Sequence, residues 1–131
     1  MSGSDDVAAA FEQLPERVNG NAPLVRRGRF LDVDFLIGAG DVPLHVSVRQ
    51  GRITDVVRGP VLMRPWRFAI RASADAWTRF WAPVPDPGYH DLFAMTKSGA
   101  AQVEGELQPL MANLRYIKDV LAAPRGTGAR A

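Results

Sequence analysis

Hydrophobic residues recur with helical spacing near the end of the chain. They are mostly three or four residues apart and therefore share one side of a helix, at Leu107, Leu110, Met111, Leu114, Ile117 and Leu121. Pro109 suits the first turn, where its missing N–H is not needed, and Pro124 is expected to stop the helix. Residues 101–105 alternate instead with a period of two, which is typical of a strand. The pattern predicts one short strand followed by one long amphipathic helix that ends near residue 123.

Three earlier segments alternate between apolar and polar residues, at 31–37, 44–48 and 53–57. Short glycine-containing turns separate them, so we predict an antiparallel meander of three strands. Each strand would have one apolar face and one solvated face, and helices would cover only the apolar face. His45 falls on the face predicted to be solvated, and Asp32 and Asp34 share the polar face of their own strand.

The middle of the chain predicts a fourth strand over 66–72 and two short helices. Ser73 is a good N-cap for the first helix, which would carry Trp77, Phe80 and Trp81. The second helix, over about 89–97, would turn Leu92, Phe93 and Met95 inward and end at Gly99. An N-terminal helix precedes the meander, and residues 19–23 form a cluster of helix breakers. The order of elements predicts an α+β fold.

The composition is that of one globular domain spanning residues 1–131, with 47% hydrophobic and 23% charged residues. Residues 1–3 and 125–131 look like flexible tails. Cysteine is absent, so disulfides and thiolate metal sites are excluded. Neither a secretory signal nor an apolar run of membrane-spanning length is visible, so we expect a cytoplasmic protein.

The formal net charge of +2 is small, and basic residues are scattered. The clearest cluster is Arg26, Arg27 and Arg29, which lacks the interleaved aromatic residues of a nucleic-acid surface. We interpret it as a solvated turn that attracts an anionic membrane surface weakly at most. No nucleic-acid partner is expected.

Residues that could perform catalysis are few. His45 and His90 are the two histidines, and His90 lies between Tyr89 and Asp91, but adjacent helical residues do not face each other. The Asp32/Asp34 pair has no further ligand at metal-binding spacing and is interpreted as a solvated sheet face. No hydrolase motif, dinucleotide fingerprint or phosphate loop occurs. We therefore predict no catalytic residues, no metal site and no cofactor.

From about residue 30 to residue 123 the chain resembles the sterol carrier protein family, a family of small lipid-transfer domains. The similarity is carried by LHVSVRQGRITDVVRG, FAIRASADAWTRFW and LFAMTKSGAAQVEGE, together with the amphipathic C-terminal helix. These are patterns of fold and contain no catalytic signature. The resemblance implies a five-stranded, mostly antiparallel sheet covered on one face by helices, with an apolar tunnel between the two layers.

The resemblance also implies non-enzymatic binding or transfer of a sterol, a fatty acid or acyl-CoA, or an isoprenoid quinone. The expected ligand-binding residues come from the sheet face, the two short helices and the C-terminal helix: Phe35, Val46, Phe68, Ile70, Trp77, Phe80, Trp81, Leu92, Phe93, Met95, Leu110, Met111, Leu114 and Ile117. One alternative is an accessory domain with a filled tunnel that partners an enzyme of lipid or quinone metabolism. Another is a small enzyme that uses His90 or the aspartate pair. The sequence leaves both monomer and homodimer open.

Overall fold

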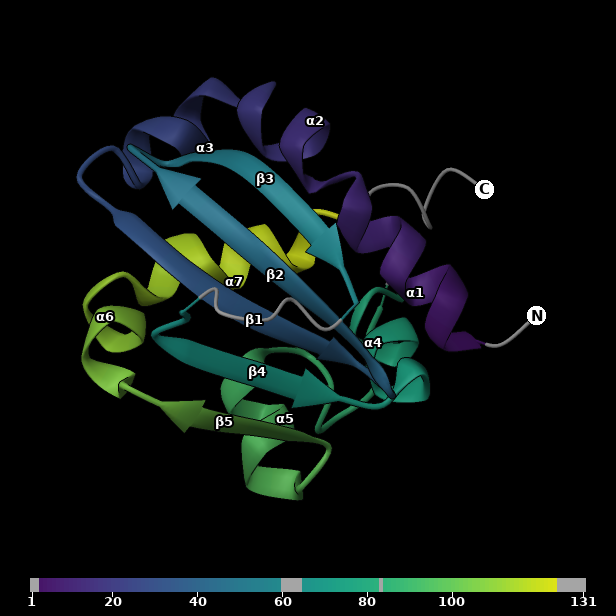
Figure 1. Ribbon diagram of the computed structural model, residues 1–131. Helices are drawn as coiled ribbons and strands as arrows, with labels where there is room; N and C mark the ends of the chain where they lie inside the picture. Colours follow the sequence, from purple (N-terminus) through teal and green to yellow (C-terminus); the bar gives the residue numbers. More distant parts are fainter. Residues whose placement is uncertain (1–2, 60–64, 83, 125–131) are drawn as a thin grey trace.

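The computed structural model describes residues 3–59, 65–82 and 84–124 (Figure 1). The expected flexible ends lie outside these residues, except Gly3, which begins the first helix. The helices and strands follow in the order α1 (Gly3–Glu12), α2 (Leu14–Asn19), α3 (Ala22–Arg27), β1 (Asp32–Ala39), β2 (Val42–Arg49), β3 (Arg52–Arg58), β4 (Phe68–Ala72), α4 (Ala74–Phe80), α5 (Leu92–Ser98), β5 (Ala101–Gly105), α6 (Leu107–Ala112) and α7 (Leu114–Ala122).

The strands form one sheet in the order β3-β2-β1-β4-β5. The pairs β1–β2, β2–β3 and β4–β5 are antiparallel, and β1–β4 is parallel. The predicted α+β fold with a five-stranded, mostly antiparallel sheet is confirmed. Phe35 pairs with Val46 and Ile37 pairs with Ile70, so these side chains share one face of the sheet.

The helices lie on the apolar side of the sheet. In Figure 1, α4, α5 and α7 lie behind the strands, while α1 and α2 lie beside β3. Asn19 at the end of α2 fixes the edge strand, because its side-chain amide donates to the Ile53 carbonyl at 2.9 Å and accepts from the Ile53 N–H at 2.8 Å. This pair of bonds to the backbone occupies hydrogen-bonding groups that an edge strand otherwise leaves open.

Helix α3 is absent from the sequence prediction, which took residues 19–23 as helix breakers. Asn21 is in fact the N-cap of α3, and its side chain accepts from the Leu24 N–H at 3.2 Å. Pro23 stands in the first turn, where proline is well tolerated. Residues that end one helix thus also begin the next.

The prediction of one continuous C-terminal helix is wrong, because the helix divides into α6 and α7 at Asn113. In a continuous helix the Asn113 N–H would bond to the Pro109 carbonyl. Here the Asn113 side chain donates to that carbonyl at 3.0 Å, and the backbone N–H turns to Leu110. Asparagine commonly competes with helical hydrogen bonds in this way.

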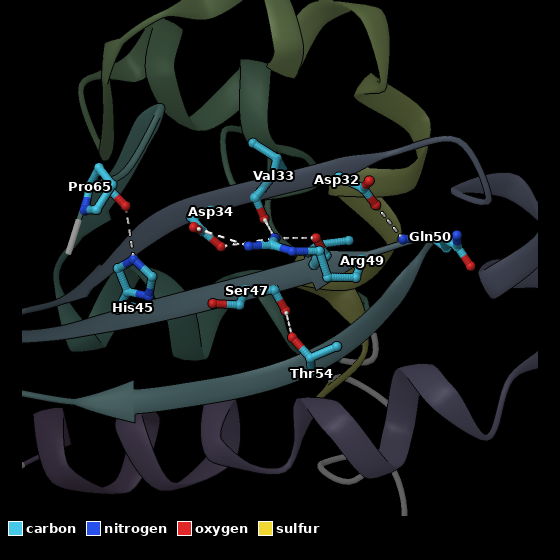
Figure 2. Close-up of polar contacts among 10 residues, drawn as sticks. Asp32, Val33, Asp34, His45, Ser47, Arg49, Gln50, Thr54 and Pro65 are labelled. Carbon is cyan, nitrogen blue, oxygen red and sulfur yellow. Dashed lines mark hydrogen bonds and ion pairs between the residues drawn. The ribbon is translucent and has the colours of Figure 1, made fainter.

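The expectation that His45 faces solvent is also wrong, since its side chain is only 2% exposed. The chain leading into β4 covers this part of the outer sheet face. His45 Nε2 lies 3.0 Å from the Pro65 carbonyl (Figure 2). The Arg67 N–H donates to the Asp34 carbonyl at 2.8 Å. The polar residues His45 and Ser47 of β2 therefore lie on the outer face of the sheet but are covered.

Candidate ligand-binding region

The inner face of the sheet forms one wall of the region between the sheet and the helices. Four of the predicted ligand-binding residues stand on it, and each has no exposed surface: Phe35, Val46, Phe68 and Ile70. The rings of Phe35 and Phe68 stack with centroids 5.1 Å apart and planes 11° apart. The predicted sheet wall is therefore assembled, and it is tightly packed.

Helix α4 supplies the aromatic side of the region. Ser73 caps the helix by accepting the Ala76 N–H at 3.0 Å, which turns Trp77 and Phe80 inward. The Trp77 indole N–H donates to the Gly38 carbonyl at 2.9 Å, so the ring is fixed against β1. Phe11 of α1 lies edge-on to both Trp77 and Trp81, with centroids 5.0 and 4.9 Å away.

Helix α5 supplies Leu92 and Met95, which are buried, whereas Phe93 is 38% exposed. Asp91 caps this helix through the Ala94 N–H at 2.8 Å, and Lys118 of α7 lies 3.6 Å from its carboxylate. The hydrogen bond from Ala94 lowers the pKa of Asp91 against the opposing effect of burial, and the charge of Lys118 lowers it further. The cap therefore stays ionised at neutral pH.

The last two helices complete the region unequally. Ile117 of α7 has no exposed surface and Leu110 of α6 has 1%, while Leu114 is partly buried and Met111 is 53% exposed. Trp81 is also partly buried, and its indole N–H donates to the Leu121 carbonyl at 2.9 Å. The structure therefore brings together most of the predicted ligand-binding residues and leaves Phe93 and Met111 at the surface.

The region between the layers is closed along the residues that meet at its centre. A side chain without accessible area adjoins no space that would hold a water molecule, and this holds for Phe35, Phe68, Trp77, Met95 and Ile117. The tunnel implied by the resemblance is not open along these side chains. A surface depression of about 210 Å³ reaches two predicted residues, Phe80 and Leu92, beside His90 and Lys118.

Sequence analysis did not single out Tyr116, which anchors this region from α7. Its side chain is 1% exposed, and its hydroxyl donates to the Gly51 carbonyl in the β2–β3 turn at 2.7 Å. Burial raises the pKa of Tyr116, so the hydroxyl stays neutral and can donate. Only its position one residue before Ile117 on the helix could have indicated burial.

The candidate catalytic residues are not brought together. His45 is buried on the outer sheet face, and His90 is exposed just before α5. Burial would raise the pKa of Asp34, but hydrogen bonds from Arg49 and Ser47 outweigh it and lower the pKa. Asp32 accepts the Gln50 N–H at 2.8 Å (Figure 2). Each aspartate thus has a structural hydrogen bond.

His45 Nδ1 is buried and has no hydrogen-bond partner among the residues described. Within the same residues, no group of three or more His, Asp or Glu side chains is placed to hold a metal ion. Over that part of the chain, no helix combines the length and apolar character needed to cross a bilayer.

No protein-family profile matches the chain, and no curated protein matches its sequence. Solved structures do match its fold. A crystal structure of sterol carrier protein 2 superimposes with a TM-score of 0.68 at 12% identity, covering 92% of this chain and 94% of the other. A ubiquinone synthesis protein, UbiJ-SCP2, gives 0.60 at 16% identity, covering 96% and 97%.

A third structure, from Thermus thermophilus, is described as a conserved hypothetical protein and possible sterol carrier protein. It gives a TM-score of 0.60 at 10% identity, covering 88% of this chain and 86% of the other. These matches span nearly the whole chain and include helices on both sides of the strand segment. The resemblance to the sterol carrier proteins is confirmed as a likeness of fold.

Proposed function

We propose that this chain, which has the fold of the sterol carrier proteins, binds a hydrophobic small molecule without covalent chemistry. The ligand would be a sterol, a fatty acid or acyl-CoA, or an isoprenoid quinone, held between the sheet and α4–α7 and available for transfer. Support comes from the match to sterol carrier protein 2 over 92% of the chain. Support also comes from the composition of the region, where aromatic and aliphatic side chains dominate.

The observation that carries the proposal is the weak attachment of α6 to this closed apolar region. Leu110 is the buried residue of α6, while Leu107 and Met111 are 49% and 53% exposed. Exposed apolar side chains on a short helix let that helix move without losing much buried area. Displacement of α6 would withdraw its buried residue Leu110 from the apolar region and admit a ligand, and Leu107 and Met111 would then contact that ligand.

The expected affinity follows from apolar burial. At about 25 cal/mol per Å², about 300 Å² of ligand surface offers roughly 7 kcal/mol before ordering terms. Because the closed region must repack around the ligand, we expect dissociation constants in the micromolar range or weaker. Transfer suits such affinities, since release must also be possible.

The test is a titration of the delipidated protein with a fluorescent fatty acid and a fluorescent isoprenoid. In a Trp66→Phe background, Trp77 and Trp81 are the remaining tryptophans and lie at the proposed site. We expect saturable energy transfer from these rings to one bound probe, reversed by unlabelled lipid. Absence of displaceable binding for both probes would overturn the proposal.

A matched pair of variants tests the role of α6. Replacing both Leu107 and Met111 with Ser should weaken probe binding roughly 30-fold, because each change removes on the order of 1 kcal/mol of apolar contact. Val84→Ser is the control, since Val84 is 85% exposed on a different segment. Equal effects of the two changes would contradict a role for α6 in binding.

A second candidate is an accessory domain with a filled interior, which partners an enzyme of lipid or quinone metabolism. The zero accessible area of the central side chains favours it, and UbiJ-SCP2, named as a ubiquinone synthesis protein, supports it by likeness of fold. Native mass spectrometry of protein from its own host separates the candidates. A bound small molecule indicates the carrier, and a bare chain in a stable complex with an enzyme indicates the accessory domain.

Catalysis forms no part of this proposal. The histidines lie on different sides of the sheet, and Asp34 is engaged by Arg49 at 3.0 Å. His90→Ala should therefore leave ligand uptake and ligand chemistry unchanged. Turnover of a bound lipid that is lost in His90→Ala would identify the protein as an enzyme.

A further inference from the structure

The arginines within residues 3–59, 65–82 and 84–124 divide into two groups with different surroundings. Those of the first group lie within ion-pair distance of carboxylates, at Arg27, Arg49, Arg58, Arg67, Arg71 and Arg79. The second group has no carboxylate of the described residues within ion-pair distance. Its members are Arg17, Arg26, Arg29, Arg52 and Arg115. The second group is not scattered over the surface.

The unpaired arginines gather where α3, the β2–β3 turn and the start of α7 meet. The Tyr116 ring lies so close to Gly28 that a Cβ there would be 2.6 Å from it, and the Tyr116 hydroxyl bonds to Gly51. These contacts bring Arg115, Arg52 and the end of α3 into one neighbourhood. Arg26 and Arg29 are joined directly, because the Arg29 guanidinium donates to the Arg26 carbonyl at 2.8 Å.

Arg17 of α2 lies beside α3, where it lines a surface depression with Arg27 and with Asp119, the ion-pair partner of Arg27. Asn19, two residues after Arg17, is hydrogen-bonded to Ile53, which follows Arg52 in β3. Glu16 of α2, Asp32 of β1 and Asp55 of β3 are carboxylates on these or adjoining elements and offset three of the five charges. An excess of two positive charges therefore remains at this end, which equals the net charge of the whole chain.

An exposed aromatic side chain stands among these charges. Phe30 is 88% exposed, the largest exposed fraction of the large apolar side chains described, and the Arg29 guanidinium lies 4.6 Å from its ring centre. The connection between α3 and β1, which contains Phe30, forms the outermost turn at the left of Figure 1. The exposed phenyl ring is therefore accessible to a partner that approaches this end.

We propose that this arginine end (Arg17, Arg26, Arg29, Arg52 and Arg115, with Phe30) docks the protein on a bilayer that contains anionic lipids. Guanidinium groups bind phosphates with two parallel hydrogen bonds, and the negative surface potential attracts the charge excess. The Phe30 ring enters the boundary between headgroups and acyl chains. One exposed aromatic ring suits the boundary of a bilayer better than single-stranded nucleic acid, whose binding uses several aromatic side chains as stacking platforms.

Co-sedimentation with vesicles tests the proposal. We compare phosphatidylcholine vesicles with vesicles of phosphatidylcholine and phosphatidylglycerol, each at low and at near-physiological salt. The wild-type protein should bind the anionic vesicles, bind them less as salt rises, and leave the neutral vesicles free. Equal binding to both vesicle types, or to neither, would overturn the proposal.

Charge variants locate the surface. The double variant Arg26→Gln/Arg29→Gln should reduce the partition coefficient about tenfold or more, and Arg26→Lys/Arg29→Lys should retain most of it. The matched control Arg71→Gln/Arg79→Gln removes the same charge from the paired group and should change binding less than about twofold. Equal losses in the two Gln variants would contradict the assignment to this end.

Phe30→Ser tests the apolar contribution separately from charge. Because the ring is exposed, thermal stability should be unchanged while vesicle binding falls several-fold. An unchanged partition coefficient would remove Phe30 from the proposal. Competition with duplex DNA completes the set, and displacement of vesicles by DNA at near-physiological salt would show that nucleic acid is the better partner.

Discussion

Helices α6 and α7 belong to the same apolar layer but are attached to it very differently. Helix α7 buries Tyr116, Ile117, Val120 and Leu121, whereas α6 buries Leu110. The Tyr116 hydroxyl bonds to Gly51, and Trp81 bonds to the Leu121 carbonyl. Neighbouring stretches of one layer thus bury very different amounts of apolar surface. Under the proposed function, we expect opening of the layer to begin at α6.

The largest expected effect separates the two helices by stability. Ile117→Ala should lower the free energy of unfolding by about 2–5 kcal/mol, because it removes fully buried atoms from a packed interior. Met111→Ala should change it by less than about 0.5 kcal/mol, since that side chain is half exposed. Urea unfolding measures both variants, and similar losses would contradict the difference in attachment.

A smaller effect concerns the anchor of α7. Tyr116→Phe should lower the free energy of unfolding by about 1–3 kcal/mol, because it removes a buried hydroxyl and leaves the Gly51 carbonyl without that partner. Urea unfolding at neutral pH measures the loss. Phe93→Leu on α5 is a suitable control because that ring is partly exposed.

The same hydroxyl predicts the behaviour in alkali. Burial raises the pKa of Tyr116 above its ordinary value of 10.0, so the unfolded chain ionises first as the pH rises. The stabilisation is complete below pH 10.0 and decreases above it, because only the unfolded state then releases the proton. The fall of stability above this pH should be shallower in Tyr116→Phe, and an identical fall would contradict it.

The smallest effect tests how α5 joins α7. Asp91→Ala should lower the free energy of unfolding by about 1 kcal/mol, because the helix loses its N-cap. Asp91→Asn should cost much less, because the asparagine side chain can also accept the Ala94 N–H. The pKa of Asp91 is lower in the folded chain than the value of 3.8 in the unfolded chain. The carboxylate therefore contributes fully to the free energy of unfolding above pH 3.8, and this contribution is lost as the pH falls through the lower pKa of the folded chain. Asp91→Asn should reduce this acid dependence, as measured by unfolding at neutral and acidic pH.

Periodicity in the sequence predicted the strands and most of the apolar side chains buried between the sheet and the helices, because burial of one face leaves a repeat of two or of three to four. Phe35, Phe68 and Trp77 are buried as predicted. The division at Asn113 was not predictable from the apolar stripe, since the stripe continues across it. A side-chain hydrogen bond to Pro109 decides the division.

Periodicity could not predict that the outer sheet face is partly covered, or which arginines lack an ion-pair partner. A period of two shows that the side chains of His45 and Val46 point to opposite faces of the sheet. It does not show that the chain near Pro65 covers His45. Ion pairing is likewise decided by tertiary contacts, as Arg27 with Asp119 illustrates. The arginine cluster was visible in the sequence, but its unpaired members on β3 and α7 join it only in the folded chain.

The most direct test of the central claim is native mass spectrometry of the delipidated protein after mixing with fatty acid and with an isoprenoid quinone. The account predicts a complex with one ligand per chain that dissociates to the bare protein. It also predicts that the Ser variant at Leu107 and Met111 takes up less ligand than Val84→Ser. A bare chain with both ligands, at concentrations well above micromolar, would contradict the claim that the region beneath α6 and α7 opens to hold an apolar molecule.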